Sequence, residues 1–324
     1  MRAARCEEYG GPGNVVIREI PDPEVTPGHV VVDVAAAAVN FPDLLFIANR
    51  YQVPAPLPFT PGSEFAGRVA AVGEGVTGLA PGDLVYGSVF TGAMADKVLV
   101  KASAVARVPP DLSLVEAAAF RVTYLTAYHA LVTAGGLRPG HWVVVLGAAG
   151  GVGSATVDVA ARLGAHVIAA ASSPERLAVC EKLGAEAAID YVGEDLKQRI
   201  REITGDGADL VVDPVGDRWA EPALRAIRWG GRFVTVGYAG GDIPRIPLNL
   251  VLLKNITVRG LELRTWTERL TEETANAVDA LTQLVAQGMR PAVSEVHELE
   301  DVGTALRRVS DRVPTGKVVI RVAS

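Results

Sequence analysis

The sequence is poor in the residues from which disulfide frameworks and zinc sites are built. It contains two cysteines, Cys6 and Cys180, and five scattered histidines among 324 residues. Two thiols cannot form a disulfide framework, and their scarcity is typical of proteins from a reducing compartment. The histidines show no metal-ligand spacing, so we expect each of them to be structural or exposed.

Long hydrophobic runs and blocks of like charge are missing as well. Nowhere do eighteen uncharged apolar residues follow one another, and the first residues, MRAARCEEYGGPG, lack the apolar core of a signal peptide. We therefore expect a cytoplasmic protein with no membrane partner. The net charge of -6 is spread along the chain without a basic tract, which argues against nucleic acid and favours a small-molecule partner.

The patterns that are present change along the chain. Up to about residue 110, short β-branched runs alternate with Gly and Pro, which predicts a compact β barrel or sandwich. After residue 143, strand and helix patterns alternate, which predicts an α/β domain with a doubly wound parallel sheet. After residue 265 this alternation stops, and a long amphipathic helix ends at Gly288. The strand patterns of the α/β part cover 143–147, 166–171, 187–190, 209–213, 232–237 and 256–261.

A glycine cluster, LGAAGGVG, follows the first of these strands and opens a helix. Its glycines have the spacing of a dinucleotide-binding turn, in which missing side chains let backbone N–H groups approach a diphosphate. The helix start adds unpaired donors and a partial positive charge. A purely structural turn is the alternative. The residues expected to contact the cofactor here are Gly147, Ala148, Gly150, Gly151, Val152 and Gly153.

The second strand, HVIAAASS, bears on which dinucleotide is bound. Chains built for NAD commonly carry Asp or Glu about twenty residues after the glycines, where a carboxylate binds the ribose hydroxyls. This chain has Ser172 there, with Arg176 one helical turn further on, and both can bind a 2′-phosphate. The alternative is that Arg176 is a solvated helix residue, which Glu175 beside it favours. We predict NADPH as the cofactor.

An ordered series of motifs runs through almost the whole chain, including VNFPDLL, PGSEFAGRVAAVG, LGAAGGVG, DPVGD, GGRFVTVGYAGG and TGKVVI. In these motifs the chain resembles the medium-chain dehydrogenase/reductases, and within them the zinc-free quinone oxidoreductases related to zeta-crystallin. The resemblance implies a GroES-like catalytic domain that surrounds a central Rossmann domain, usually in a homodimer. The implied segments are 1–124 and 266–324 for the catalytic domain and 125–265 for the NADP-binding domain.

Zinc members of this superfamily hold their catalytic metal with Cys, His and Glu or Cys. Here Ser63 stands before Glu64, at the place of the histidine, and Asn40 and Phe41 occupy the region of the first ligand. The two cysteines cannot form the four-cysteine site of the structural zinc. The sequence therefore predicts no metal and a zinc-independent enzyme.

Without a metal, hydride must reach a carbon whose added electrons delocalise onto an oxygen, as in quinones and enones. The resemblance implies that Asn40 and Tyr51 line the substrate cleft and that Thr126 lies near the nicotinamide. Tyr51 is the candidate hydrogen-bond donor, although it can be a packed aromatic, with water or the ribose as the proton source. The resemblance also places at the cofactor Tyr191, Val215, Gly216, Gly237, Tyr238 and Lys317. For Tyr191 and Tyr238 a purely structural role is the alternative.

Together these features predict an NADPH-dependent reductase of quinones or activated α,β-unsaturated carbonyls. One alternative is an enoyl-thioester (enoyl-CoA) reductase on the same scaffold. Another is a non-catalytic NADPH-binding protein with a structural or regulatory role. Arg121 stands where many relatives have proline, and it favours an acidic substrate unless it faces solvent.

Overall fold

The computed structural model describes residues 1–323, which form two compact units. The terminal unit contains residues 1–122 and the segment that begins at Arg290, and the central unit is Thr123–Met289. Ser324, the last residue of the third predicted segment, lies outside the described residues.

Residues 266–289 pack with the central unit, whereas the sequence assigned them to the segment that returns to the catalytic domain. Side-chain contacts explain this placement. The Trp266 ring lies 5.8 Å from the His129 ring and 5.4 Å from the Arg259 guanidinium carbon, between the respective centres. The terminal unit therefore resumes at Arg290.

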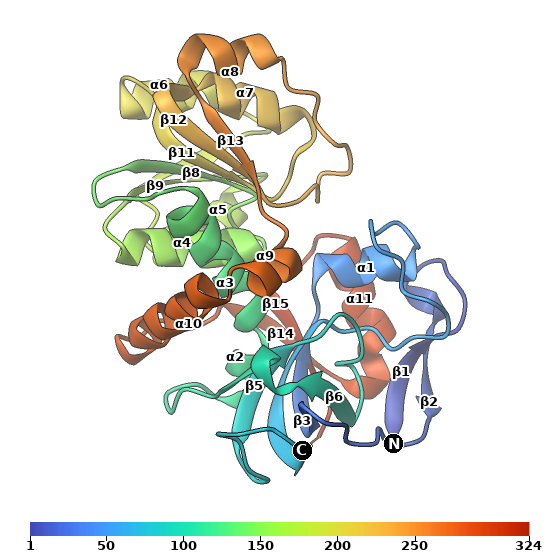
Figure 1. Ribbon diagram of the computed structural model, residues 1–324. Helices are drawn as coiled ribbons and strands as arrows, with labels where there is room; N and C mark the ends of the chain where they lie inside the picture. Colours follow the sequence, from blue (N-terminus) through green and yellow to red (C-terminus); the bar gives the residue numbers. More distant parts are fainter. Residues whose placement is uncertain (324) are drawn as a thin grey trace. The chain divides into compact units, whose positions relative to one another are not determined.

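The central unit is built on a six-stranded parallel sheet, so the predicted Rossmann-type fold is confirmed (Figure 1). Its order, β10-β9-β8-β11-β12-β13, reverses between β8 and β11, and ligands bind open α/β sheets at such a switch point. The strands are β8 (Trp142–Leu146), β9 (His166–Ala171), β10 (Ala187–Asp190), β11 (Ala208–Asp213), β12 (Ile227–Thr235) and β13 (Thr257–Gly260).

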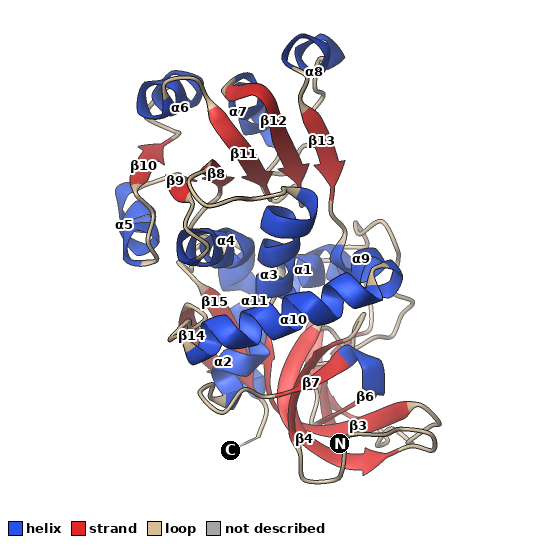
Figure 2. Ribbon diagram, turned by 60° about the vertical axis from the view of Figure 1, so that its left-hand side comes forward, coloured by secondary structure: helices blue, strands red, loops and turns tan. Residues whose placement is uncertain are grey.

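Helices cover both faces of this sheet, which explains why its inner strands are almost uniformly apolar. Helices α4 (Gly151–Arg162) and α5 (Pro174–Lys182) lie on one face, and α6 (Leu196–Thr204) and α7 (Ala220–Arg225) lie on the other (Figure 2). The remaining helices are α3 (Arg121–Tyr128), which starts in the terminal unit, a π-helix at His129–Ala134, a short 3-10 turn at Asp217–Trp219, α8 (Leu248–Lys254), α9 (Leu263–Arg269) and α10 (Thr271–Ala286).

The terminal unit holds a mixed sheet in the order β14-β15-β3-β4-β5-β7, with β6 paired to β3, and a separate β1-β2 hairpin. The strands are β1 (Arg2–Cys6), β2 (Val15–Glu19), β3 (His29–Ala38), β4 (Glu64–Val72), β5 (Leu84–Ser88), β6 (Lys97–Lys101), β7 (Val105–Arg107), β14 (Val293–Glu298) and β15 (Lys317–Arg321). The helices are α1 (Phe41–Ile47), α2 (Leu114–Ala118) and α11 (Val302–Ser310), with 3-10 turns at Pro12–Asn14, Ala102–Ala104 and Leu299–Asp301.

The register of this sheet gathers polar residues from distant parts of the chain. Ala38 at the end of β3 lies opposite Glu64 at the start of β4, and also opposite Val319 of β15. Residues that follow β3, precede β4 or begin β15 therefore lie together at the same end of these three neighbouring strands.

Candidate active site

The glycine turn of the central unit follows β8, and each of its glycines meets a different steric demand. Gly147 has a φ of +58°, a backbone conformation that residues other than glycine rarely adopt. A Cβ on Gly153 would lie 2.1 Å from the Gly147 carbonyl oxygen, so this glycine allows α4 to pack on the turn. A Cβ on Gly150 would have one neighbour within 4 Å, that same oxygen, at 3.3 Å.

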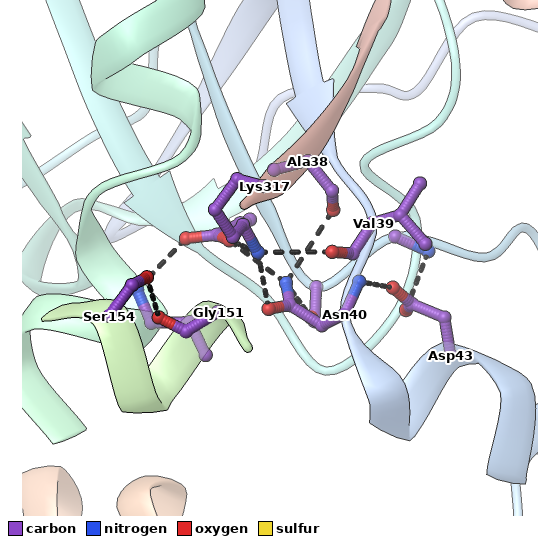
Figure 3. Close-up of polar contacts among 11 residues, drawn as sticks. Ala38, Val39, Asn40, Asp43, Gly151, Ser154 and Lys317 are labelled. Carbon is purple, nitrogen blue, oxygen red and sulfur yellow. Dashed lines mark hydrogen bonds and ion pairs between the residues drawn. The ribbon is translucent and has the colours of Figure 1, made fainter. Parts of the chain in front are cut away.

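The start of α4 offers backbone donors to an anion. Gly150 is its N-cap and no side chain caps the helix. Ala148 and Ala149 are buried, whereas Gly151 and Val152 are partly exposed. Ser154, in the same turn, donates its hydroxyl to the Gly151 carbonyl at 3.2 Å (Figure 3). The turn therefore fits a diphosphate, because uncapped N–H groups face a space that one side chain would fill.

The end of β9 carries the predicted 2′-phosphate residues. Ser172 is exposed, and Arg176 is half-buried in the first turns of α5. Ser173 is the N-cap residue and Pro174 follows it, but the Ser173 hydroxyl makes no cap hydrogen bond. The side chain of Ser173 instead bonds the Glu175 carboxylate and lowers its pKa. A negative charge thus lies at this helix start, beside the predicted phosphate residues.

The ends of β11 and β12 bring together four more predicted cofactor residues. The Val215 and Gly216 N–H groups each donate to Asp213 Oδ1 at 2.8 Å. A Cβ on Gly216 would lie 2.8 Å from the Tyr238 ring, and one on Gly237 would have room, since its nearest neighbour is 3.5 Å away. These residues lie at the carboxyl ends of parallel strands, the edge at which the glycine turn also lies.

Tyr191, at the end of β10, has an aromatic neighbour that the sequence did not reveal. Its ring lies 4.4 Å from the ring of Trp219, and its side chain is buried. The Arg218 guanidinium also lies over Trp219, 4.5 Å from its centroid. Packing within the central unit therefore accounts for this tyrosine, and its cofactor contact stays a prediction.

Asp213 is fully buried, its Oδ2 has no hydrogen-bond partner, and burial raises its pKa to about 6. Because the folded protein binds this proton more tightly than the unfolded chain, Asp213 lowers stability as pH rises through that range. We expect Asp213→Asn to become more stable relative to the wild type by about 2 kcal/mol between pH 4.5 and 7.5. Urea unfolding of both proteins at both pH values measures this difference. If the free energies of unfolding of the two proteins change equally between pH 4.5 and 7.5, the raised pKa of Asp213 is contradicted.

In the terminal unit, Asn40, Ser63, Glu64 and Lys317 form a polar cluster. Figure 3 labels Asn40 and Lys317 of this cluster. The Lys317 ammonium donates to the Glu64 carboxylate at 2.8 Å, the Asn40 Oδ1 at 2.7 Å and the Val39 carbonyl at 3.0 Å. Glu64 is fully buried, Lys317 is 4% exposed, and the Val122 N–H donates to the second carboxylate oxygen. The buried ion pair is thus satisfied by hydrogen bonds.

Asn40 is held firmly in this cluster. Its Nδ2 donates to Glu64 Oε1 at 2.9 Å and to Ser63 Oγ at 3.2 Å. Its backbone N–H donates to the buried Asp43, whose pKa burial raises to about 7. Both amide protons of Asn40 have acceptors within the terminal unit, so the predicted direct contact of this amide with a substrate stays a prediction.

The other predicted catalytic residues lie on different elements. Tyr51, in the terminal unit, packs its ring 4.5 Å from that of Phe46. Thr126 is buried in α3 of the central unit. Lys317, predicted at the cofactor, uses all three ammonium protons within its own unit. The roles of these three residues stay predictions.

Arg121 is buried rather than solvent-facing, with 6% of its surface exposed. Its Nε is without a hydrogen-bond partner among residues 1–323, and its guanidinium lies 6.0 Å from the Tyr86 ring centroid. Burial lowers its pKa. The solvent-facing alternative for this residue is wrong, while a role in attracting an acidic substrate stays a prediction.

The donor set of the polar cluster does not fit zinc. Its single carboxylate, Glu64, already pairs with Lys317, and Ser63 and Asn40 offer a hydroxyl and an amide where zinc prefers thiolate and imidazole. In the described chain, 1–323, no three His, Cys, Asp or Glu side chains gather so that they could hold a metal ion.

Two protein families match the chain. The alcohol dehydrogenase GroES-like domain matches residues 26–110, and the zinc-binding dehydrogenase family matches residues 151–283. Quinone oxidoreductase-like protein 2 of Bos taurus is 37% identical over 322 residues, which cover 98% of this chain and 92% of that protein. The chain belongs to the medium-chain dehydrogenase/reductase superfamily. Within this superfamily it is a quinone oxidoreductase-like protein, so the predicted family is confirmed.

Solved structures of the superfamily share the whole fold. A probable oxidoreductase from Mycobacterium abscessus has a TM-score of 0.91 and 34% identity, with 99% of each chain covered. Escherichia coli quinone oxidoreductase, solved with NADPH, has a TM-score of 0.93 and 28% identity, with 99% of this chain and 100% of that chain covered. The chain is thus an oxidoreductase of this superfamily. None of its helices within residues 1–323 is long and apolar enough to cross a membrane.

Proposed function

We propose that the protein is an NADPH-dependent reductase that transfers hydride to quinones or activated α,β-unsaturated carbonyls without zinc. The observation that carries this proposal is the pairing of Glu64 with Lys317, beside Ser63 at the place of a zinc ligand. A positive side chain holds the carboxylate that zinc members use near their metal. Reduction therefore relies on a substrate that can spread the added electrons onto an oxygen without a metal.

Bound NADPH supplies the hydride. The glycine turn holds its diphosphate through the uncapped N–H groups at the start of α4, and Ser172 and Arg176 hold the 2′-phosphate. The loops after β11 and β12 contact its remaining parts through Val215, Gly216, Gly237 and Tyr238. Thr126 orients the nicotinamide carboxamide, and Tyr51 offers a neutral phenol to the substrate.

The reductase proposal is tested by following NADPH oxidation at 340 nm with 1,2-naphthoquinone, an alkyl vinyl ketone and crotonyl-CoA. Turnover of the quinone or the enone, retained after dialysis against a chelator, supports the proposal. A strong preference for crotonyl-CoA would identify an enoyl-thioester reductase. Arg121 favours this alternative, because a cation attracts an acidic substrate. Tight NADPH binding without turnover of any substrate would favour the structural or regulatory role.

Cofactor preference gives a prediction at the start of α5. We expect Arg176→Ala to raise the KM for NADPH by roughly 10- to 100-fold, because a hydrogen bond to a charged group contributes about 1.5–3 kcal/mol. The KM for NADH should change little. Glu175→Gln is the matched variant, and it should lower the KM for NADPH, because it removes the negative charge beside Ser173. Equal effects of Arg176→Ala on both cofactors would remove the 2′-phosphate assignment.

We also propose a cytoplasmic homodimer that pairs through the edge of the parallel sheet. Strand β13 lies at this edge and is exposed along its length. Nearby in sequence, α8 exposes Leu248, Leu252 and Leu253, each at more than 70%. An open strand edge and exposed leucines are features that a second copy can cover. Sedimentation at micromolar concentration tests this, and a monomer would contradict it.

A further inference from the structure

A directed chain of hydrogen bonds leads from a buried cation to a partly exposed hydroxyl in the terminal unit. Lys317 Nζ donates to Asn40 Oδ1 at 2.7 Å, and Asn40 Nδ2 donates to Ser63 Oγ at 3.2 Å. An ammonium group can only donate, so the Asn40 oxygen must face Lys317 and its amide protons must face Ser63 and Glu64. The orientation of the amide is therefore fixed.

Ser63 is the open end of this chain. Its hydroxyl oxygen accepts from Asn40, and the hydroxyl donates no hydrogen bond within residues 1–323. The other three members of the polar cluster are at most 6% exposed, whereas Ser63 itself is partly exposed. Ser63 is thus the member of the polar cluster that can donate a hydrogen bond to a molecule from outside.

The chain also makes Ser63 a better donor than an isolated serine. Each hydrogen bond polarises the next, and a low local dielectric strengthens this coupling. The positive charge of Lys317 starts the polarisation, and its contact with Glu64 offsets the negative charge that would otherwise oppose it. A hydroxyl that accepts from a polarised amide donates more strongly to an oxygen that gains negative charge.

We propose that Ser63 donates the hydrogen bond that stabilises the substrate oxygen during hydride transfer, with Asn40 and Lys317 as its positioning residues. This inference rests on the proposed reductase function. A C–H bond forms at the substrate carbon, the C–H bond of the reduced nicotinamide breaks, and the π electron pair moves onto the oxygen. Ser63 keeps its proton, and water protonates the product. The substrate must therefore carry a carbonyl oxygen conjugated to the carbon that is reduced.

The test compares Ser63→Ala with Ser63→Thr, using NADPH and 1,2-naphthoquinone. Loss of one such donor costs about 10²- to 10³-fold in kcat, so Ser63→Ala should lose that much while the Kd for NADPH stays within about threefold. Ser63→Thr keeps the hydroxyl and should retain kcat within about tenfold. Ser103→Ala, in an exposed 3-10 turn of the same unit, is the matched control and should behave as wild type.

The kinetic isotope effect measured with NADPH deuterated at the transferred position distinguishes a catalytic role of Ser63 from a purely structural one. If Ser63 stabilises the transition state, hydride transfer becomes slower in Ser63→Ala, and the isotope effect on kcat rises above that of the wild type. A wild-type kcat in Ser63→Ala would overturn the proposed role of Ser63 and leave the reductase proposal intact. A raised KM with an unchanged isotope effect, or equal losses in the alanine and threonine variants, would also overturn it. A wild-type protein that reduces no quinone or enone would overturn the reductase proposal instead.

Discussion

Gly150→Val is expected to abolish NADPH binding while the protein stays folded. Gly150 has a φ of -79°, which valine can adopt, and the nearest atom to an added Cβ is 3.3 Å away. The backbone conformation therefore suits valine, the Gly147 carbonyl must shift by a few tenths of an ångström, and the new side chain fills the space in front of the α4 donors. We expect the Kd for NADPH to rise at least roughly 100-fold, since contacts to a charged diphosphate contribute several kcal/mol. Calorimetric titration with NADPH measures the change.

The control for this variant is Gly11→Val in the terminal unit. Gly11 is also an N-cap with extended backbone, and no atom lies within 4 Å of an added Cβ. It should bind NADPH like the wild type and show the same melting temperature. If Gly150→Val binds NADPH with wild-type affinity, the diphosphate does not lie at this turn.

Lys317→Met is expected to destabilise the terminal unit by about 3–5 kcal/mol, because it leaves the carboxylate of Glu64 buried without its positive partner. Glu64 has no exposed surface, and the Lys317 ammonium contacts it at 2.8 Å. Asn40 and the Val122 N–H would still donate to Glu64, but neither carries a charge. Urea unfolding at neutral pH, followed by circular dichroism, gives the free energy of unfolding.

Two further variants separate the buried charge from the loss of a lysine as such. Lys97→Met removes a pair with Asp22 of similar length, 2.6 Å, but both side chains are substantially exposed, so it should cost no more than about 1 kcal/mol. Lys317→Met combined with Glu64→Gln should recover part of the loss, because no unpaired charge remains. Similar losses for Lys317→Met and Lys97→Met would show that burial does not determine the contribution of this pair.

The sequence was sufficient where local pattern determines the structure. The glycine turn, the six strand segments of the parallel sheet and the helix stop at Gly288 all arise from residues close in the chain. The polar cluster could not be predicted in this way, because Lys317 meets a partner 253 residues away. The sequence marked Ser63 only as a departure from a zinc ligand, and only the register of β3, β4 and β15 shows what surrounds it.

Competition between close neighbours also escaped the sequence. Ser173 is the N-cap residue of α5, yet its hydroxyl bonds Glu175 and not the backbone, a choice between two partners that a residue pattern does not encode. Likewise, the sequence did not reveal that Trp219 packs on Tyr191, and the cofactor contact of Tyr191 stays a prediction. Side-chain partners of this kind follow from tertiary packing.

Strand β15 has a consequence for synthesis on the ribosome. It lies between β14 and β3, and its first residue, Lys317, follows Glu64 by 253 residues. Chains grow from the N-terminus, so β3 and Glu64 emerge long before their partners exist. Until β15 has been synthesised, the nascent terminal unit presents an unpaired strand edge on β3 and an uncompensated acid, Glu64. Emergence of β15, rather than of the first strands, therefore permits this unit to complete its folding.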